Sequence, residues 1–197
     1  TWAGLKPLGV FYRLAIQDIQ DVADLFRPYY DASKGTDGFV CLEVNPDLAH
    51  DTQGTIDEAK WLWSEVDRPN LMVKIPGTKA GLPAITEAIA SGINVNVTLI
   101  FSRQRYQAVM KAYLDGIQKR VEAGKDVAHI ASVASFFVSR LESIADDHLN
   151  KLIDNGGKDA EKAKQIIGKI AVANTKLAYK AYEEFFGSDQ YKVLAKS

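Results

Sequence analysis

The sequence predicts an α/β protein of the parallel (β/α)-barrel, or TIM-barrel, type. Four short apolar runs alternate with segments of helical periodicity, and this order is typical of a parallel sheet covered by helices. Three of the runs also carry polar side chains near the end at which each run stops. No low-complexity tract or Ser/Pro-rich linker interrupts the alternation, so we expect residues 1–197 to form one domain.

The predicted strands are short, apolar and bounded by turn-forming residues. They cover residues 39–44, a stretch within residues 70–78 that Pro76 ends near Lys74, residues 93–99 and residues 127–133. The predicted helices carry apolar residues at helical spacing. They cover residues 16–30, 55–68, 83–90, 103–122, 136–149 and 159–186.

Particular residues mark the ends of these helices. Thr55, with Glu58 three positions later, matches the capping-box pattern at the start of the second helix. Pro69 ends that helix, because the residue before a proline disfavours the helical conformation. Gly187 is placed to end the long last helix.

The composition argues against several kinds of partner. The chain has 24 basic and 25 acidic residues, a balance that gives no reason to expect nucleic acid or an anionic membrane as a partner. Cys41 is the single cysteine, so an intramolecular disulfide and a thiolate metal cluster are excluded, and we expect a buried thiol. The N-terminal stretch does not resemble a secretory signal, and no apolar run reaches the roughly 18 residues of a membrane span. We therefore expect a cytoplasmic protein.

Lys74 is unusual because it lies inside an apolar run, between Val73 and Ile75. Burial disfavours the ammonium form of a lysine, and this is how an amine becomes a nucleophile near neutral pH. Its place at the end of a strand suits this role, because α/β folds bind and transform ligands at the carboxyl ends of their strands. The alternative is a lysine that extends its side chain to water.

Alternation along the strands places further polar groups on the same side as Lys74. In the third strand the polar residues share one face and the aliphatic residues share the other. The polar residues are Asn94, Asn96 and Thr98, and the aliphatic residues are Val95, Val97 and Leu99. In the first strand Cys41 and Glu43 lie opposite Val40, Leu42 and Val44. A barrel directs such polar groups to a shared rim, and for this reason we favour a barrel over an open doubly wound sheet.

Lys74, Glu43, Asn96 and Thr98 are the groups that a Schiff-base enzyme requires. The amine attacks a ketone, and the resulting iminium draws in the electrons of a breaking carbon–carbon bond. A carboxylate and a hydroxyl can position a water that moves protons, and an amide can orient the amine or a substrate hydroxyl. The alternatives are an ion pair between Glu43 and Lys74 and a hydrogen-bonded polar network at Asn96 and Thr98.

Ser135 and Arg140 form a second candidate group, after the fourth strand. We expect Ser135 at the start of the fifth helix, where backbone N–H groups and the helix dipole favour a phosphate. Arg140 can add the bidentate donors of its guanidinium. The alternative is that Ser135 caps the helix and that Arg140 pairs with Glu142.

Four ordered motifs of the chain together resemble transaldolase. They are residues 39–44 with Glu43, residues 71–78 with Lys74, residues 94–102 with the sequence NVTLIFS, and residues 135–140. The longer bacterial transaldolases are the most similar, through residues 12–18 and 38–46. The resemblance implies a (β/α)8 barrel that transfers a dihydroxyacetone unit from sedoheptulose 7-phosphate or fructose 6-phosphate to an aldose phosphate, in the non-oxidative pentose phosphate pathway.

The resemblance also implies a role for each site residue. Lys74 is the Schiff-base lysine, and Glu43 and Thr98 hold the catalytic water. Asn96 contacts the lysine or the bound dihydroxyacetone. Ser135 and Arg140 hold the substrate phosphate, and Phe137 lines its pocket. Neither a metal nor an organic cofactor is implied.

The resemblance assigns to this chain the third to sixth of eight barrel strands, so we expect a barrel that is incomplete at both ends. The acid/base aspartate and the substrate-contacting asparagine of the family's first strands have no counterpart. We expect either a homodimer or association with the missing barrel segments. The alternative functions are a related class I aldolase, such as fructose 6-phosphate aldolase, and a non-catalytic half barrel that needs a partner chain.

Overall fold

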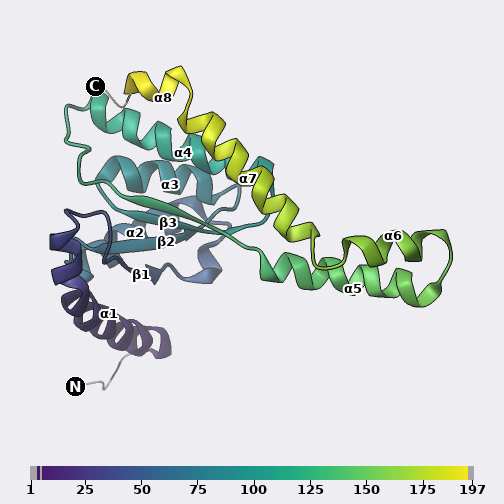
Figure 1. Ribbon diagram of the computed structural model, residues 1–197. Coiled ribbons are helices and arrows are strands. Elements are labelled where there is room, and N and C mark those ends of the chain that lie inside the picture. Colours follow the sequence, from purple (N-terminus) through teal and green to yellow (C-terminus); the bar gives the residue numbers. More distant parts are fainter. Residues whose placement is uncertain (1–3, 5, 195–197) are drawn as a thin grey trace. The chain divides into compact units, whose positions relative to one another are not determined.

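The computed structural model describes residue 4 and residues 6–194 (Figure 1). The helices are α1 (Pro7–Ala32), α2 (Thr52–Val66), α3 (Gly81–Ser91), α4 (Arg103–Glu122), α5 (Ser139–Asn155), α6 (Lys158–Ile166), α7 (Ile170–Phe186) and α8 (Asp189–Leu194), and a short 3-10 helix, η1, covers Pro46–Leu48. The strands are β1 (Val40–Glu43), β2 (Leu71–Pro76), β3 (Val95–Ile100) and β4 (Ser132–Phe136).

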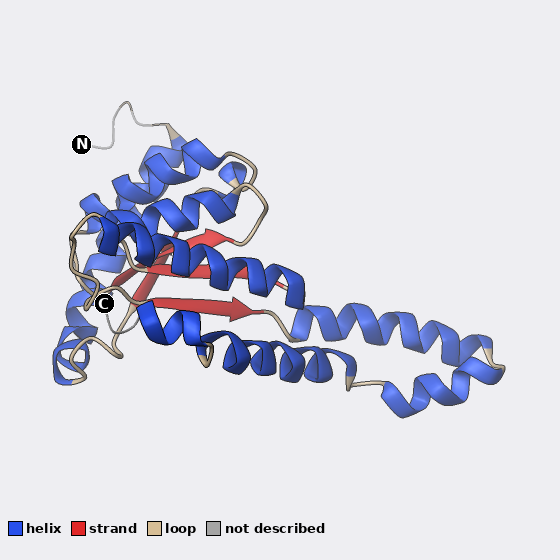
Figure 2. Cartoon of the chain, turned by 90° about the horizontal axis from the view of Figure 1, so that it is seen from above, coloured by secondary structure: helices blue, strands red, loops and turns tan. Residues whose placement is uncertain are grey.

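The strands form one parallel sheet in the order β1-β2-β3-β4, seen as red arrows in Figure 2. Each strand is followed by at least one helix, so the α/β class and the parallel alternation predicted from the sequence are confirmed. Chain contacts divide the molecule into two compact units, Thr1–Thr98 with Lys111–Ala134 and Leu99–Met110 with Ser135–Ser197. None of the described helices is long and apolar enough to cross a membrane.

The core of the first unit lies between one face of the sheet and the helices α2 and α3, both of which pack on β2. The aliphatic residues on this face have less than a tenth of their surface exposed: Val40, Leu42, Leu71, Val73, Ile75, Val95 and Val97. They meet Leu62 and Val66 of α2 and Ile85 and Ile89 of α3, which have no exposed surface. Each such side chain contributes about 1.5–3 kcal/mol by its burial, and this fixes which strand face turns toward the helices.

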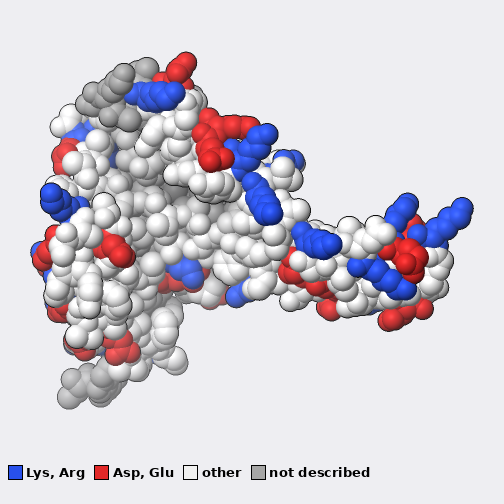
Figure 3. Space-filling model, in the orientation of Figure 1, with Lys and Arg blue, Asp and Glu red and all other residues white. Residues whose placement is uncertain are grey.

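The second unit is mostly helical. Helices α5 and α6 lie side by side, as Figures 1 and 2 both show, and α7 also packs on α5. On the face drawn in Figure 3, the acidic and basic side chains of the described residues are interspersed. This distribution agrees with the formal net charge of −1.

Helices α1 and α2 begin earlier than predicted. Pro7 occupies the first turn of α1, where its fixed φ suits a helix and no amide donor is lost. The capping box predicted at Thr55 and Glu58 is wrong. Asp51 caps α2 instead, by accepting a hydrogen bond from the Gly54 N–H at 3.0 Å. Thr55 lies inside the helix, and its hydroxyl donates to the Leu48 and Asp51 carbonyls.

The fourth strand and the fifth helix are displaced from the predicted positions. Residues 127–131 form a turn, in which the Asp126 carboxylate accepts from Ala128 N–H and the Asn94 side chain accepts from Ala131 N–H. The strand therefore starts at Ser132 and ends at Phe136, and α5 begins only at Ser139. The first of these hydrogen bonds is local, whereas the bond from Ala131 to Asn94 joins residues 37 positions apart and leaves no local pattern in the sequence.

The long helix predicted over residues 159–186 is divided into α6 and α7. Gly168 separates them with a φ of 70°, and its N–H donates to Asp146 of α5 at 2.9 Å. The N–H of Ala171, in the first turn of α7, donates to the Glu142 carboxylate of α5 at 3.0 Å. Two acidic side chains of α5 thus stabilise the break. Gly187 follows α7 as predicted.

Strand alternation holds up to Thr98 and then changes. Leu99, predicted on the aliphatic face, is 39% exposed, whereas Ile100 is fully buried. The cause is the left-handed conformation of Leu99, whose φ is 58°. A left-handed residue interrupts the pleat, at a cost of about 1–2 kcal/mol for a non-glycine side chain.

Candidate active site

Three of the predicted site residues form a row across the sheet. Glu43 at the end of β1 is the register partner of Lys74 in β2, and Lys74 is the partner of Asn96 in β3. In parallel strands, register partners have side chains on the same face. Their common face is the one opposite α2 and α3, as the alternation predicted.

Lys74 and Glu43 form an ion pair, with 3.3 Å between Nζ and Oε2. The Lys74 side chain is 30% exposed and the Glu43 side chain is 41% exposed. The expectation of an amine enclosed among aliphatic side chains is therefore wrong for the described residues. Only the stem of Lys74 lies between buried strand neighbours, while its amine reaches a carboxylate at the rim of the sheet.

Thr98 is two residues beyond Asn96 in β3 and is the register partner of Pro76. It is 1% exposed, and its Oγ1 is buried without a hydrogen-bond partner among the described residues. Its carbonyl accepts from Gly77 N–H at 2.8 Å, which ties β3 to the loop after β2. A buried hydroxyl without a partner costs about 1–3 kcal/mol, and a bound water or substrate atom would relieve this cost.

Asn96 donates through Nδ2 to the sulfur of Cys41 at 3.3 Å. Cys41 is exposed, so the prediction of a buried thiol is wrong. The strand alternation had placed Cys41 beside Glu43, and this pattern is the signal that could have identified it as part of the site face. The thiol therefore accepts a hydrogen bond from the Asn96 amide, on the face that carries Lys74.

The remaining predicted residues belong to the second unit. Ser135 lies in β4, four residues before α5, so its expected place at a helix start is wrong. The Arg140 guanidinium lies over the Phe137 ring, 4.8 Å from its centroid, and Phe101 stacks with Phe137 at 5.3 Å. Glu142, suggested as an alternative partner of Arg140, instead bonds to the start of α7.

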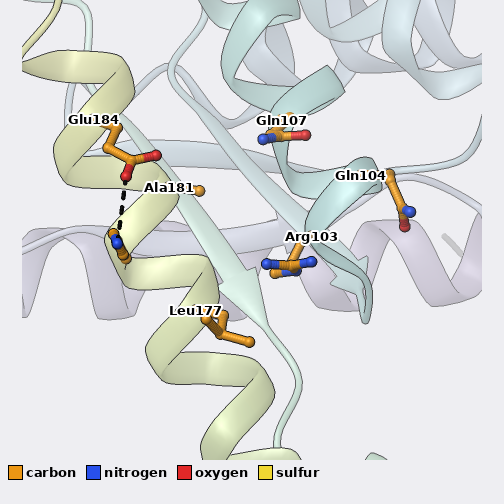
Figure 4. Close-up of a pocket in the computed structure, with 7 residues that line it drawn as sticks. Arg103, Gln104, Gln107, Leu177, Ala181 and Glu184 are labelled. Carbon is orange, nitrogen blue, oxygen red and sulfur yellow. Dashed lines mark ion pairs between the residues drawn. The ribbon is translucent and has the colours of Figure 1, made fainter.

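Two hollows lie elsewhere. One of about 410 Å³ lies in the second unit, where the start of α4 meets α7 (Figure 4). Its lining residues are Arg103, Gln104, Gln107, Leu177, Lys180, Ala181 and Glu184, and Lys180 pairs with Glu184 at 3.8 Å. The other, of about 240 Å³, lies in the first unit and includes Trp63, Asn94 and Arg120. Neither hollow is lined by a predicted site residue.

Nearly the whole chain is similar to known proteins. Residues 3–197 match the family model described as transaldolase/fructose-6-phosphate aldolase. A transaldolase of Parafrankia sp. is 52% identical over 178 residues, 90% of this chain and 47% of that protein. Transaldolase 2 of Streptomyces coelicolor is 54% identical over an alignment of 200 positions, which covers 99% of this chain and 52% of that protein. Transaldolase 2 of Nostoc sp. is 47% identical over 196 residues, 98% of this chain and 51% of that protein.

The chain spans about half the length of the curated relatives it matches. The family match nevertheless covers nearly all of its own residues, including both groups of predicted site residues. The chain belongs to the transaldolase/fructose-6-phosphate aldolase family.

Proposed function

We propose that the protein is a transaldolase, which transfers a dihydroxyacetone unit from a ketose phosphate to an aldose phosphate. The proposed donors are sedoheptulose 7-phosphate and fructose 6-phosphate, and the proposed setting is the pentose phosphate pathway in the cytoplasm. The observation that carries the proposal is the Lys74–Glu43 pair, 3.3 Å apart at the carboxyl ends of two parallel strands, in a chain of this family.

Lys74 is the proposed nucleophile. Its Nζ attacks the ketone carbon, and loss of water gives an iminium. The iminium takes up the electron pair of the neighbouring carbon–carbon bond as that bond breaks, the hydroxyl on the leaving carbon gives its proton to the active-site water, and the aldose leaves. The three-carbon enamine stays on Lys74 until it adds to the aldehyde carbon of the acceptor, whose oxygen takes up a proton. Water then hydrolyses the new iminium, which releases the ketose phosphate and restores the Lys74 amine.

Glu43 and Thr98 are the proposed holders of the water that moves protons during iminium formation. The Glu43 carboxylate is close enough to the amine to accept its proton. The Thr98 hydroxyl has a free hydrogen-bonding capacity among the described residues, which supports a role in holding a water. Asn96, whose amide donates to Cys41, is proposed to contact the bound three-carbon unit.

Ser135, Phe137 and Arg140 are the proposed binding residues for the substrate phosphate. The guanidinium of Arg140 lies over the ring of Phe137, an arrangement that holds the cation in place. Arginine binds phosphate oxygens with two parallel hydrogen bonds, and a serine hydroxyl can add a third.

We also propose that the active protein forms one (β/α)-barrel domain with more strands than these four. The order β1-β2-β3-β4 leaves β1 and β4 as edges of an open sheet, and a barrel has no edges. The half-length coverage of the relatives supports this proposal. The additional strands would come from the same chain or from a partner chain.

Borohydride trapping tests the proposed function. The full-length protein is incubated with fructose 6-phosphate and reduced, and the modified peptide is identified by mass spectrometry. We expect a reduced dihydroxyacetone unit on Lys74. The Lys74→Met variant should give no adduct, and the matched variant Lys79→Met, which changes an exposed lysine, should give the normal amount. Absence of the adduct from the unmodified protein would refute the proposal.

Product analysis distinguishes transfer from release. With erythrose 4-phosphate present, a transaldolase forms a seven-carbon ketose phosphate from fructose 6-phosphate. A fructose-6-phosphate aldolase releases free dihydroxyacetone whether or not the acceptor is present. The three relatives reported above are named transaldolase, which favours transfer.

A further inference from the structure

A hydrogen-bonded chain connects α1 and α2 to the end of β1. The Tyr12 hydroxyl of α1 donates to Glu58 Oε1 of α2 at 2.6 Å. The other oxygen of the same carboxylate, Oε2, accepts from the backbone N–H of Asn45 at 2.5 Å. Tyr12 is 6% exposed, and its ring packs edge-on against Trp61 of α2 at 5.1 Å. Both oxygens of Glu58 are therefore occupied by groups that come from other elements.

Asn45 is two residues beyond Glu43, so these hydrogen bonds act on the backbone that carries the proposed water-binding carboxylate. Between them, Val44 is 1% exposed, and its N–H donates to the Lys74 carbonyl at 3.1 Å. The exit of β1 is thus held at two successive amides. Val44 is fixed to the neighbouring strand, and Asn45 is fixed to α2.

The carboxylate of Glu58 is not needed for capping its own helix. Asp51 already caps α2, and Glu58 lies in the second turn. A carboxylate that accepts from a phenol and from an amide at short distances makes charge-assisted hydrogen bonds, which are stronger and more directional than neutral ones. Burial and the Glu58 carboxylate raise the pKa of Tyr12, so its hydroxyl remains a donor throughout the neutral range.

We propose that Tyr12 and Glu58 are positioning residues that hold the Glu43 carboxylate against the Lys74 amine. A role of Tyr12 and Glu58 in catalysis rests on the proposed function, whereas their positioning of the Glu43 carboxylate does not. Glu58 fixes the Asn45 amide, the amide fixes the backbone direction after β1, and this direction sets where Glu43 points. Tyr12 keeps the Glu58 carboxylate in the orientation that reaches Asn45.

A zero-length crosslink measures the positioning without any substrate. A carbodiimide joins a carboxylate to an amine only when the two are in contact, and Glu43 and Lys74 are 3.3 Å apart. The yield of the Glu43–Lys74 amide, read by mass spectrometry, should fall about tenfold in Glu58→Leu, because misplacement by about 1 Å has large effects on such reactions. Glu58→Gln should crosslink normally, because its amide oxygen still accepts from Asn45 and its nitrogen can donate to Tyr12.

Two further variants control for a general loss of structure. Tyr12→Phe retains the ring and removes one donor, so it should give an intermediate yield even if Glu58→Leu does not fold. Thr86→Val removes a comparable hydrogen bond, between α3 and the Ala112 carbonyl of α4, and should leave the yield unchanged. An unchanged yield in both Tyr12→Phe and folded Glu58→Leu overturns the proposal, as does an equal fall in Thr86→Val.

The borohydride trapping rate then tests the catalytic part. If Glu58 acts through Glu43, Glu58→Leu slows trapping about tenfold in the native background and has no further effect in a Glu43→Gln background. Independent, multiplicative effects of the two substitutions show that Glu58 does not act through Glu43. Failure of the unmodified protein to form an adduct refutes the proposed function, and the crosslink yields still decide the positioning.

Discussion

At the residue scale, Thr98 presents a buried hydroxyl that has no hydrogen-bond partner among the described residues. Replacing it with valine keeps the shape and removes the unpaired polar group. We expect Thr98→Val to leave the free energy of unfolding unchanged or to raise it by about 1 kcal/mol, while dihydroxyacetone trapping falls. Urea denaturation measures the first effect, and borohydride reduction measures the second.

Thr55 provides the matched control for this prediction. It is as deeply buried as Thr98, but its hydroxyl donates to two carbonyls, at 2.7 and 2.9 Å. Thr55→Val should therefore lower the free energy of unfolding by about 1 kcal/mol, because the hydrogen bonds of the hydroxyl are lost while each carbonyl keeps a backbone N–H donor. Equal destabilisation by the two substitutions would mean that a bound water or another group stabilises the Thr98 hydroxyl before substrate binds.

Tyr12 predicts a pH dependence of stability. Burial first, and the hydrogen bond to Glu58 second, raise the pKa of Tyr12 above its ordinary value of 10.0. Above pH 10 the unfolded chain loses this proton while the folded chain keeps it, so the stabilisation is complete below pH 10 and is lost as the pH rises further. At most, this one group lowers the free energy of unfolding by about 1.4 kcal/mol for each pH unit.

Urea midpoints between pH 8 and pH 11 check this sign. Above pH 10, the urea midpoint should fall less steeply with pH in Tyr12→Phe than in the native protein. This fall should not vanish, because burial also raises the pKa of Tyr106. A slope identical in both proteins would show that Tyr12 ionises normally in the folded state.

At the element scale, the start of α2 depends on Asp51. We expect Asp51→Ala to lower the free energy of unfolding by about 1 kcal/mol, because the Gly54 N–H loses its acceptor. Asp51→Asn should retain most of the stability, since asparagine caps helices equally well. Asp57→Ala, which removes an exposed partner of Gln53 in the same helix, should change it by less than about 0.5 kcal/mol. The opposite ranking would show that the Asp51 side chain does not stabilise the start of α2.

The predicted and observed helices and strands agree where an element follows from the local sequence. The helix over residues 103–122 has the predicted ends, and the strands at Glu43 and Lys74 lie where their apolar runs indicated. The start of β4 and the break between α6 and α7 were not predicted. Both depend on side chains distant in the chain, Asn94 for the first and Asp146 with Glu142 for the second.

At the scale of the whole molecule, the two compact units differ in the size of their buried side chains. The first contains a layer of fully buried Leu, Ile and Val residues around β2. After Ser135, by contrast, the buried apolar residues in the described part of the chain are Leu149 and four alanines. Because less apolar surface is removed from water in this part of the chain, helices α5 to α7 should open at a lower free energy than the sheet core around β2.

Hydrogen exchange with mass spectrometry tests this difference. Amides of β2 and β3 should exchange slowest, and amides of α6 and α7 should exchange faster by more than about tenfold, which corresponds to 1.4 kcal/mol of opening free energy. Equal protection throughout would indicate a single cooperative unit.

Hydrophobic periodicity and the strand–helix order determined the α/β class and the common face of Glu43, Lys74 and Asn96, because these depend on spacing along the chain. Only the tertiary structure decided that the lysine amine is paired rather than enclosed, that Cys41 is exposed beside Asn96, and that Glu58 reaches Asn45 instead of capping its helix. These outcomes depend on which distant groups meet in space, and neither the periodicity nor the composition of a chain specifies such meetings.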